Sequence, residues 1–172
     1  MNEKKPAPHD PDLGPRTTLC VGAVVLRGDK VLFVRQTYGK LKGAWSLPWG
    51  LVDGVGPDGV PEPPDQAAVR ETREEAGIIA RVEGLLGVQN HATQDGRLAL
   101  YLLYLCHHVS GEPTPDDHPT DRAAYLSWHE INNLGEPVDE FCHWMACRVL
   151  TDEHHLTPPA SSNPYHPHLA FL

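Results

Sequence analysis

The sequence of 172 residues predicts an α/β fold, with strands arranged around one central helix. Three observations support this prediction. A hairpin rich in β-branched residues occupies residues 17–35, a second pair of strands occupies residues 78–109, and one well-capped helix lies between them. The length suits a single domain with its own core. We expect that domain at residues 17–156, between a flexible arm at 1–16 and a Pro-rich tail at 157–172.

The first strand pair is predicted by its turn. Residues 17–26 are rich in Thr and Val, residues 27–30 read Arg-Gly-Asp-Lys, and residues 31–35 return as the second strand. A short extended piece follows at residues 44–48. Residues 50–64 hold four Gly and four Pro, which predicts a loop.

The central helix is predicted from Pro64 to Ala76 by signals at both ends. Pro64 suits the first helical position, and Asp65 complements the positive end of the helix dipole. Gly77 suits a left-handed C-terminal cap, with Ile78 as the apolar contact beyond it. The helix should therefore span thirteen residues.

The second half of the chain predicts further strands and a last helix. Strands at residues 78–91 and 97–109 should be joined at Asp95-Gly96, and the apolar run 98–106 predicts a strand that is buried on both faces. An acidic loop follows at residues 110–121. The remaining predicted elements are a strand at 123–128, a helical turn at 129–134 and a helix from Pro137 to Glu153. The apolar stripe of that helix consists of Phe141, Trp144, Met145 and Val149.

Composition excludes several functional classes. The net charge of −9 argues against binding nucleic acid or anionic membranes through a basic surface. No apolar run approaches the roughly 20 residues of a membrane span, and residues 1–16 lack the apolar core of a signal peptide. The four cysteines show no CxxC spacing, which predicts free, mostly buried thiols and a cytoplasmic protein. The eleven histidines lack the spacing of a structural zinc site.

Three glutamates lie on one face of the predicted central helix. Glu71, Glu74 and Glu75 are spaced i, i+3 and i+4, so their carboxylates spread over an arc of about 100°. Like charges at this spacing repel one another. The face is therefore either a solvated surface or a site for a hard cation such as Mg²⁺, which prefers oxygen ligands.

The residues around these glutamates form a longer motif. From Glu62 the chain continues with seven residues, Arg70-Glu71, Glu74-Glu75, Gly77 and Ile78. This pattern is similar to the signature of the Nudix hydrolase family, G-x5-E-x7-R-E-U-x-E-E-x-G-U, where U is aliphatic. The segment Leu47-Pro48-Trp49-Gly50 resembles the family's Leu-Pro-Gly-Gly lead-in. The resemblance covers roughly residues 17–150 and implies an α/β/α sandwich with a central mixed β-sheet.

The chain departs from this signature in its loop. Eleven residues separate Gly50 from Glu62, where the family has five, so we expect about six extra residues. Gly56 stands six residues before Glu62, but we interpret that match as accidental. Trp49 replaces the first glycine of the pair, and Thr72 stands where an aliphatic residue is usual. The enlarged loop, residues 51–61, is the segment expected to influence the choice of substrate.

The resemblance also implies roles for single residues. Glu71, Glu74, Glu75 and the backbone carbonyl of Trp49 would hold Mg²⁺ or Mn²⁺. Either Glu71 or Glu75 would be the general base that takes a proton from the attacking water. Arg70 joins the catalytic set, and we expect it to pair with Glu62 or Glu74.

Substrate contacts are expected from residues on both sides of the motif. The residues predicted to bind substrate are Arg35, Trp49, Gly50 and Asp121. Asp116, Asp117 and Asp121 are candidates for the late-loop acid that family members recruit, and Tyr38 and His91 are weaker substrate candidates. Trp49 could stack on a nucleobase, whereas Trp45, Trp128 and Trp144 are expected in the core.

The predicted activity is hydrolysis of a diphosphate in a nucleoside diphosphate that is linked to another moiety. The substrate would be a small molecule: a nucleotide sugar, a dinucleotide or a nucleoside triphosphate. The alternative is a catalytically silent Nudix-fold module that binds a nucleotide or has a regulatory role. An isomerase on the same fold is disfavoured, because no cysteine stands near the motif. A homodimer is compatible with the apolar end of the tail.

Overall fold

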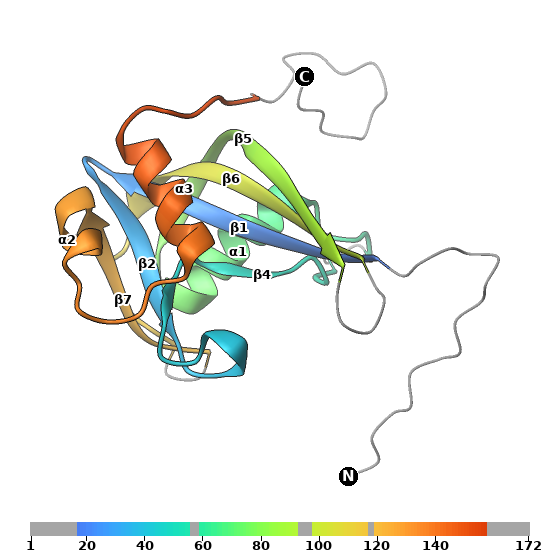
Figure 1. Ribbon diagram of the computed structural model, residues 1–172. Helices are drawn as coiled ribbons and strands as arrows, with labels where there is room; N and C mark the ends of the chain where they lie inside the picture. The colour runs from blue at the N-terminus through green and yellow to red at the C-terminus, as the bar shows by residue number, and fades with distance from the viewer. Residues whose placement is uncertain (1–16, 56–58, 93–97, 117–118, 158–172) are drawn as a thin grey trace, which may run out of the picture.

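The computed structural model describes residues 17–157, except residues 56–58, 93–97 and 117–118 (Figure 1). The predicted arm at 1–16, the Asp95-Gly96 turn and tail residues 158–172 lie outside the described residues. The strands are β1 (Thr17–Arg27), β2 (Lys30–Gln36), β3 (Trp45–Ser46), β4 (Trp49–Leu51), β5 (Ile79–Ala92), β6 (Leu98–Ser110) and β7 (Thr120–Ser127). The helices are a 3-10 turn (Gly39–Leu41), α1 (Pro64–Ala76), α2 (Trp128–Asn132) and α3 (Glu140–Leu150).

The strands form one mixed sheet, in the order β3-β2-β1-β6-β5. β1 and β6 run parallel, whereas the other strand pairs are antiparallel. β4 adds to β1 through Gly22 and Trp49, and β7 adds to β2. The strand β1 therefore connects the segment around Trp49 to the rest of the sheet.

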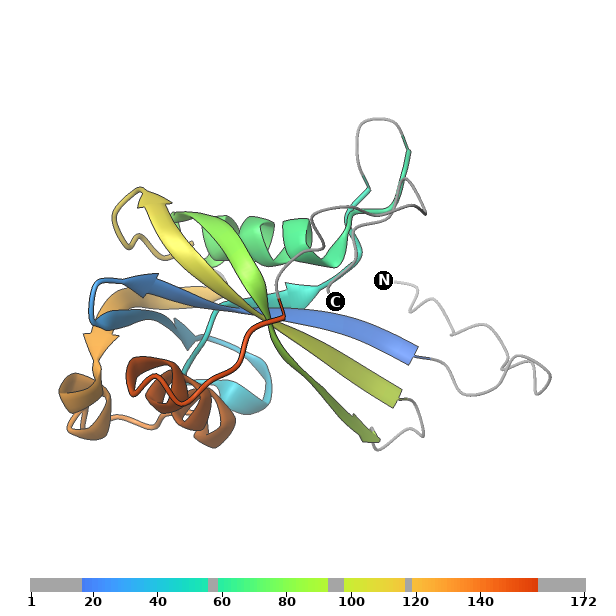
Figure 2. The same cartoon turned by 90° about the horizontal axis from the view of Figure 1, so that it is seen from above.

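Helices cover both faces of the sheet. α1 packs on one face, and α3 and α2 lie on the other (Figures 1 and 2). Alternate residues of a strand point to opposite faces, so β1 and β2 each contribute to two cores. Val21 and Val34 face the core beneath α1, while Val24 and Phe33 face the core beneath α3. The observed architecture is the expected α/β/α sandwich with a central mixed sheet.

The central helix matches its prediction at both ends. α1 spans Pro64–Ala76, and Gly77 follows in the left-handed conformation with φ 67°. Proline at the start and glycine past the end are local signals that act whatever the tertiary context. Ile78 is fully buried beyond the cap, as expected.

The last helix is shorter than predicted. The expected bounds, Pro137 to Glu153, were wrong at both ends, because Asp139 caps the helix by accepting a hydrogen bond from the Cys142 amide at 2.9 Å and Thr151 ends it. The predicted stripe was partly wrong as well. Trp144 is 52% exposed, and the buried face consists of Cys142, Met145, Ala146 and Val149.

Two other burial predictions need correction. Trp45 is in the core as expected, but Trp128 is 45% exposed. The apolar run 98–106 is fully buried only over residues 103–106 and residue 99, because the strands extend past the two helices that cover the sheet (Figure 2).

The four cysteines are free, and only Cys147 among them is not buried, which confirms the predicted thiols. No helix in the described ranges is long and apolar enough to span a membrane.

Candidate active site

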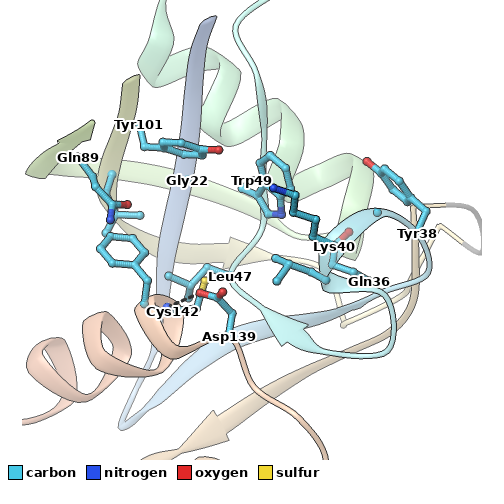
Figure 3. A pocket seen from close by; sticks show the side chains of 14 residues that line it. Gly22, Gln36, Tyr38, Lys40, Leu47, Trp49, Gln89, Tyr101, Asp139 and Cys142 are labelled. Carbon is cyan, nitrogen blue, oxygen red and sulfur yellow. Dashed lines mark hydrogen bonds between the residues drawn. The ribbon is translucent and has the colours of Figure 1, made fainter. Parts of the chain in front are cut away.

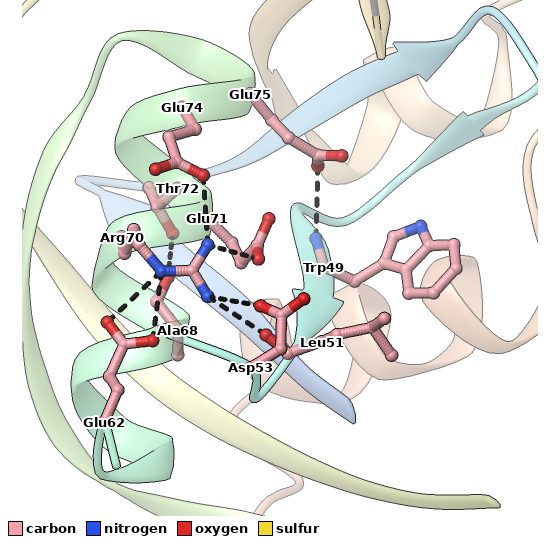
Figure 4. Close-up of polar contacts among 10 residues, drawn as sticks. All are labelled: Trp49, Leu51, Asp53, Glu62, Ala68, Arg70, Glu71, Thr72, Glu74 and Glu75. Carbon is pink, nitrogen blue, oxygen red and sulfur yellow. Dashed lines mark hydrogen bonds and ion pairs between the residues drawn. The ribbon is translucent and has the colours of Figure 1, made fainter. Parts of the chain in front are cut away.

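Arg70 organises the glutamate face of α1 (Figure 4). Its Nη1 donates to Glu71 at 2.6 Å and to Glu74 at 3.0 Å, and its Nε donates to Glu62 at 3.0 Å. Nη2 donates to the carbonyl oxygen of Leu51 at 3.0 Å. The expected pairing is confirmed for both Glu62 and Glu74. One guanidinium therefore joins the helix to the loop that precedes it and offsets part of the carboxylate repulsion.

Gly50 makes room for the Glu71 carboxylate. A Cβ atom at position 50 would lie 2.0 Å from Cδ of Glu71 and 2.2 and 2.3 Å from its two oxygens. Such distances are far below van der Waals contact, so a side chain at this position would displace the carboxylate. Burial raises the pKa of Glu71, and the neighbouring Arg70 opposes that shift.

Glu75 is the most enclosed of the three glutamates. The residue is 4% exposed, and its carboxylate accepts a hydrogen bond from the Trp49 amide at 3.2 Å and one from Gln36 Nε2 at 3.5 Å. Burial raises the pKa of Glu75 from 4.5 to about 7, while the Trp49 and Gln36 hydrogen bonds lower it. Trp49 thus contributes its backbone N–H to the site in this structure; the predicted role of its carbonyl stays a prediction.

The late acidic loop caps the C-terminal end of α1. Thr120, which is fully buried, donates from Oγ1 to the carbonyl oxygen of Glu75 at 2.7 Å, and the Thr114 amide donates to the carbonyl oxygen of Ala76 at 2.9 Å. These bonds satisfy helix carbonyls that have no partner within the helix. The loop therefore fixes the turn that carries Glu75 through neutral donors.

The structure describes two of the three acidic residues expected from this loop. Asp116 is exposed and its amide donates to Thr120 Oγ1 at 3.4 Å, and Asp117 lies outside the described residues. Asp121 accepts two hydrogen bonds from Arg35, at 2.8 and 2.6 Å, which lower the pKa of its carboxyl. Arg35 also donates to Glu136 at 3.1 Å.

The enlarged loop closes on itself at its base. The Glu62 amide donates to the Gly54 carbonyl oxygen at 2.9 Å, and Val55 and Pro61 form an antiparallel bridge. A Cβ at Gly54 would lie 2.5 Å from Glu62 Oε2, so glycine lets the two ends meet. Val55 and Pro61 therefore lie side by side where the enlarged loop meets the body, and the expected six extra residues stay a prediction.

A cavity of about 450 Å³ lies beside Trp49, on the sheet face that α3 covers (Figure 3). Its walls come from β1, the end of β2, the 3-10 turn, β4, the later part of β5, β6 and the start of α3. The lining residues are Gly22, Gln36, Tyr38, Gly39, Lys40, Leu41, Leu47, Trp49, Gln89, Tyr101, Leu103, Asp139, Phe141 and Cys142. Gln36 borders both this cavity and Glu75, so the cavity adjoins the glutamate face.

The structure brings together only some of the predicted substrate residues. Trp49 and Tyr38 line the cavity, and Gly50 contacts Glu71. Arg35 and Asp121 bind each other and are not part of the cavity wall, so their role in substrate binding stays a prediction. The side chain of His91 lies outside the described part of the structure, so its role in substrate binding stays a prediction.

The sequence did not point to the other polar residues of the cavity, which include Gln36, Lys40, Gln89 and Asp139. Gln36 is 2% exposed at the end of β2, whose middle residues, Val31 to Val34, are buried and apolar. Lys40 lies in the short turn between two glycines with positive φ, Gly39 and Gly43, and no ion pair to it is found in the described part of the chain.

The donor set suits a hard divalent cation in its chemistry. Glu71, Glu74 and Glu75 supply carboxylate oxygens, and the space that a Cβ at Gly50 would fill is taken by Glu71. Within the described ranges, however, no three acidic, His or Cys side chains converge as a metal site, and Arg70 pairs with both Glu71 and Glu74. The side chain of Glu74 is 47% exposed.

Several known proteins are similar to this chain. A protein of Methanocaldococcus jannaschii named ADP-ribose pyrophosphatase is 27% identical over 117 residues, which are 67% of this chain and 63% of that protein. The chain therefore spans less than two thirds of that relative. A MutT-like protein of Streptomyces ambofaciens is 26% identical over 134 residues, 77% of each chain. The crystal structure of a MutT NUDIX hydrolase from Burkholderia pseudomallei has a TM-score of 0.63 and 26% identity, and the match covers 78% of this chain and 98% of that one.

A family model extends the comparison to almost the whole described chain. The model of the NUDIX domain matches residues 16–155. This range contains β1 to α3, the Arg70 cluster and the enlarged loop. The chain therefore belongs to the Nudix hydrolase family.

Proposed function

We propose that the protein is a pyrophosphohydrolase that cleaves the diphosphate of a nucleoside diphosphate linked to another moiety, with Mg²⁺ or Mn²⁺ as cofactor. The observation that carries this proposal is the packing of the Glu71 carboxylate on Gly50 beside the buried Glu75. Glu75 contacts Trp49 and Gln36, and both of these residues line the cavity. Glu71, Glu74, Glu75 and the Trp49 carbonyl would hold the ion.

The bound ion would offset phosphate charge and acidify a water molecule. The chain's own groups then have distinct tasks. Glu75 or the neighbouring Glu71 would take the proton of the attacking water. Arg70 steadies Glu71 and the Glu62 loop. Thr120 holds the backbone of Glu75 in place.

The cavity would receive the nucleoside. Trp49 and Tyr101, with ring centroids 6.3 Å apart, offer aromatic surface for a base, and Lys40 offers a cation at the wall. ADP-ribose is the first compound to test, because the Methanocaldococcus jannaschii relative bears the name ADP-ribose pyrophosphatase.

The test is a hydrolysis panel of ADP-ribose, other nucleotide sugars, dinucleotides and nucleoside triphosphates with Mg²⁺, followed by chromatography of the released nucleotide. Wild type should cleave at least one class, and Glu75→Gln and Glu74→Gln should lower kcat/KM. Glu140→Gln, on the first turn of α3, is the matched control and should match wild type. If wild type is as inert as the Glu75→Gln variant on every compound, the proposal is wrong.

A second candidate is a nucleotide-binding module without turnover. The observation in its favour is that Arg70 occupies oxygens of both Glu71 and Glu74, which leaves the expected cation ligands paired with a guanidinium. This candidate predicts ADP-ribose binding by calorimetry without hydrolysis at any Mg²⁺ or Mn²⁺ concentration.

A further inference from the structure

The cavity beside Trp49 continues into a second hollow of about 410 Å³. Four residues line both hollows: Gln89, Tyr101, Leu103 and Phe141. Gln89 and Tyr101 lie across the cavity from Tyr38 in Figure 3. The two hollows therefore form one trough between the β5–β6 pair and α3, and its far part leads away from the glutamates.

The far part of the trough extends along α3. Phe141 lines both hollows, whereas Trp144 and Arg148 line only the far one. Phe141 and Arg148 are seven residues apart, which places them about 10 Å apart along a helix axis. The part of a substrate that fills the first cavity could thus extend as far as Arg148.

The charge of the far hollow contrasts with that of the whole chain. The chain carries −9, yet the described residues that line the far hollow include Arg148, His154 and His155 and no acidic residue; Asp152 Oδ1 lies 3.9 Å from His154 Nδ1. No ion pair is found for Arg148 within the described residues; its guanidinium lies 5.2 Å from the centre of the Trp144 ring. An arginine that forms no ion pair with the described residues, beside two imidazoles and apolar walls, is suited to an anionic group at the end of an otherwise uncharged part of a substrate.

We propose that the far hollow is a subsite for a phosphomonoester on the nucleoside arm of the substrate. This inference rests on the proposed function and narrows its substrate class to nucleoside diphosphate compounds with an additional phosphate on the nucleoside ribose. A planar guanidinium binds a phosphate with two parallel hydrogen bonds, and Arg148 is the residue at this end that offers that geometry.

The test uses substrate pairs that differ only in this phosphate: ADP-ribose against 2′-phospho-ADP-ribose, and dephospho-coenzyme A against coenzyme A. Wild type should prefer the phosphorylated member by about tenfold or more in kcat/KM. Arg148→Gln should bring that ratio close to one, and Arg148→Lys should restore part of it. Arg81→Gln, which removes an exposed arginine from β5, is the matched control and should keep the wild-type ratio.

Binding separates this inference from the proposed function. Calorimetry with Glu71→Gln measures both members of each pair without turnover. Tighter binding of the phosphorylated member, lost in the Glu71→Gln/Arg148→Gln double variant, supports the subsite even if wild type hydrolyses neither compound. Equal affinity for both members, or a preference that survives Arg148→Gln, overturns it.

Discussion

At the scale of single residues, the contact between Gly50 and Glu71 constrains the site most strongly. The three atoms nearest to a Cβ added at Gly50 all belong to the Glu71 carboxylate. The glycine is therefore required by one neighbouring side chain, since the residue has no positive φ. The loss of unfolding free energy caused by a substitution at Gly50 should therefore depend on whether the Glu71 carboxylate is present.

Gly50→Ala should reduce the free energy of unfolding by about 1–3 kcal/mol, because the added methyl overpacks the contact. It should also lower kcat/KM about 100-fold by displacing Glu71. In a Glu71→Ala background the same substitution should cost less than about 0.5 kcal/mol, because the clashing group is gone. Urea unfolding of the four proteins measures the coupling; equal costs in both backgrounds would contradict the contact.

Glu75 should make stability depend on pH. Its pKa is raised from 4.5 to about 7 in the folded chain, so folding favours the protonated carboxyl. That stabilisation is complete below the unfolded value and is lost as pH rises through the folded value. In EDTA, the unfolding free energy of wild type relative to Glu75→Gln should fall by roughly 2 kcal/mol between pH 5 and pH 8. Glu74→Gln, at an exposed position, is the control and should track wild type; a difference that does not vary with pH would count against the raised pKa.

At the scale of elements, the position of the last turn of α1 depends on a loop that is distant in sequence. Thr120 and Thr114 supply the donors that complete this turn. The loop was expected to matter through its acidic residues. In the described part of the loop, it is the hydroxyl and amide donors that contact the helix.

Thr120→Val should leave the Glu75 carbonyl oxygen without its hydroxyl partner, at a cost of about 1–2 kcal/mol in unfolding free energy. It should also lower kcat by about tenfold through movement of Glu75. Thr120→Ser keeps the hydroxyl and should restore kcat even if it loses some packing. Steady-state kinetics of both variants is the measurement. Equal kcat values for the valine and serine variants would argue against a positioning role.

The enlarged loop should be removable. Deleting residues 55–60 and joining Gly54 to Pro61 should preserve the fold, because the Gly54–Glu62 hydrogen bond already brings these ends together. A change of loop length by six residues carries only a small entropic cost, below about 1 kcal/mol. Circular dichroism checks the fold, and kinetics on the full hydrolysis panel compares the ranking of substrates with that of wild type. A large change in the ranking of substrates would show that the loop selects substrate, which was the expectation from the sequence.

At the scale of the whole molecule, the sandwich places the two halves of the site on opposite sides of one strand. α1 and α3 lie on opposite faces of the sheet (Figure 2). The glutamates come from α1, whereas the start of α3 lines the cavity. Trp49 on β4 belongs to both, because its amide contacts Glu75 and its ring lines the cavity.

Divalent metal should stabilise the whole fold. A ligand at 10 to 100 times its Kd adds roughly 1.4–2.7 kcal/mol to the unfolding free energy. We expect Mg²⁺ or Mn²⁺ to raise Tm at pH 8 more than at pH 5.5, because burial raises the pKa values of Glu71 and Glu75 and protons compete for these carboxylates. Differential scanning fluorimetry measures the shift. Glu71→Gln should abolish it, and an equal shift in that variant would place the metal elsewhere.

Much of the fold could be predicted because its signals are local. The bounds of α1 follow from Pro64 and Gly77, and the hairpin follows from the turn between β1 and β2. The bounds of α3 were harder, because Pro137 and Asp139 are competing signals for a helix start, and the side-chain cap at Asp139 prevailed. The burial of Trp144 could not be read from periodicity, since it depends on which face of α3 meets the sheet.

The sequence by itself determined the family motif and the helix that carries Glu71, Glu74 and Glu75, because both depend on residues that are close along the chain. Only the tertiary structure decided that Arg70 holds two of those glutamates, that Arg35 binds Asp121, and that a trough runs from Trp49 to Arg148. The last two join segments that are distant along the chain. Their partners are chosen by the packing of the sheet and its helices, which no local pattern specifies.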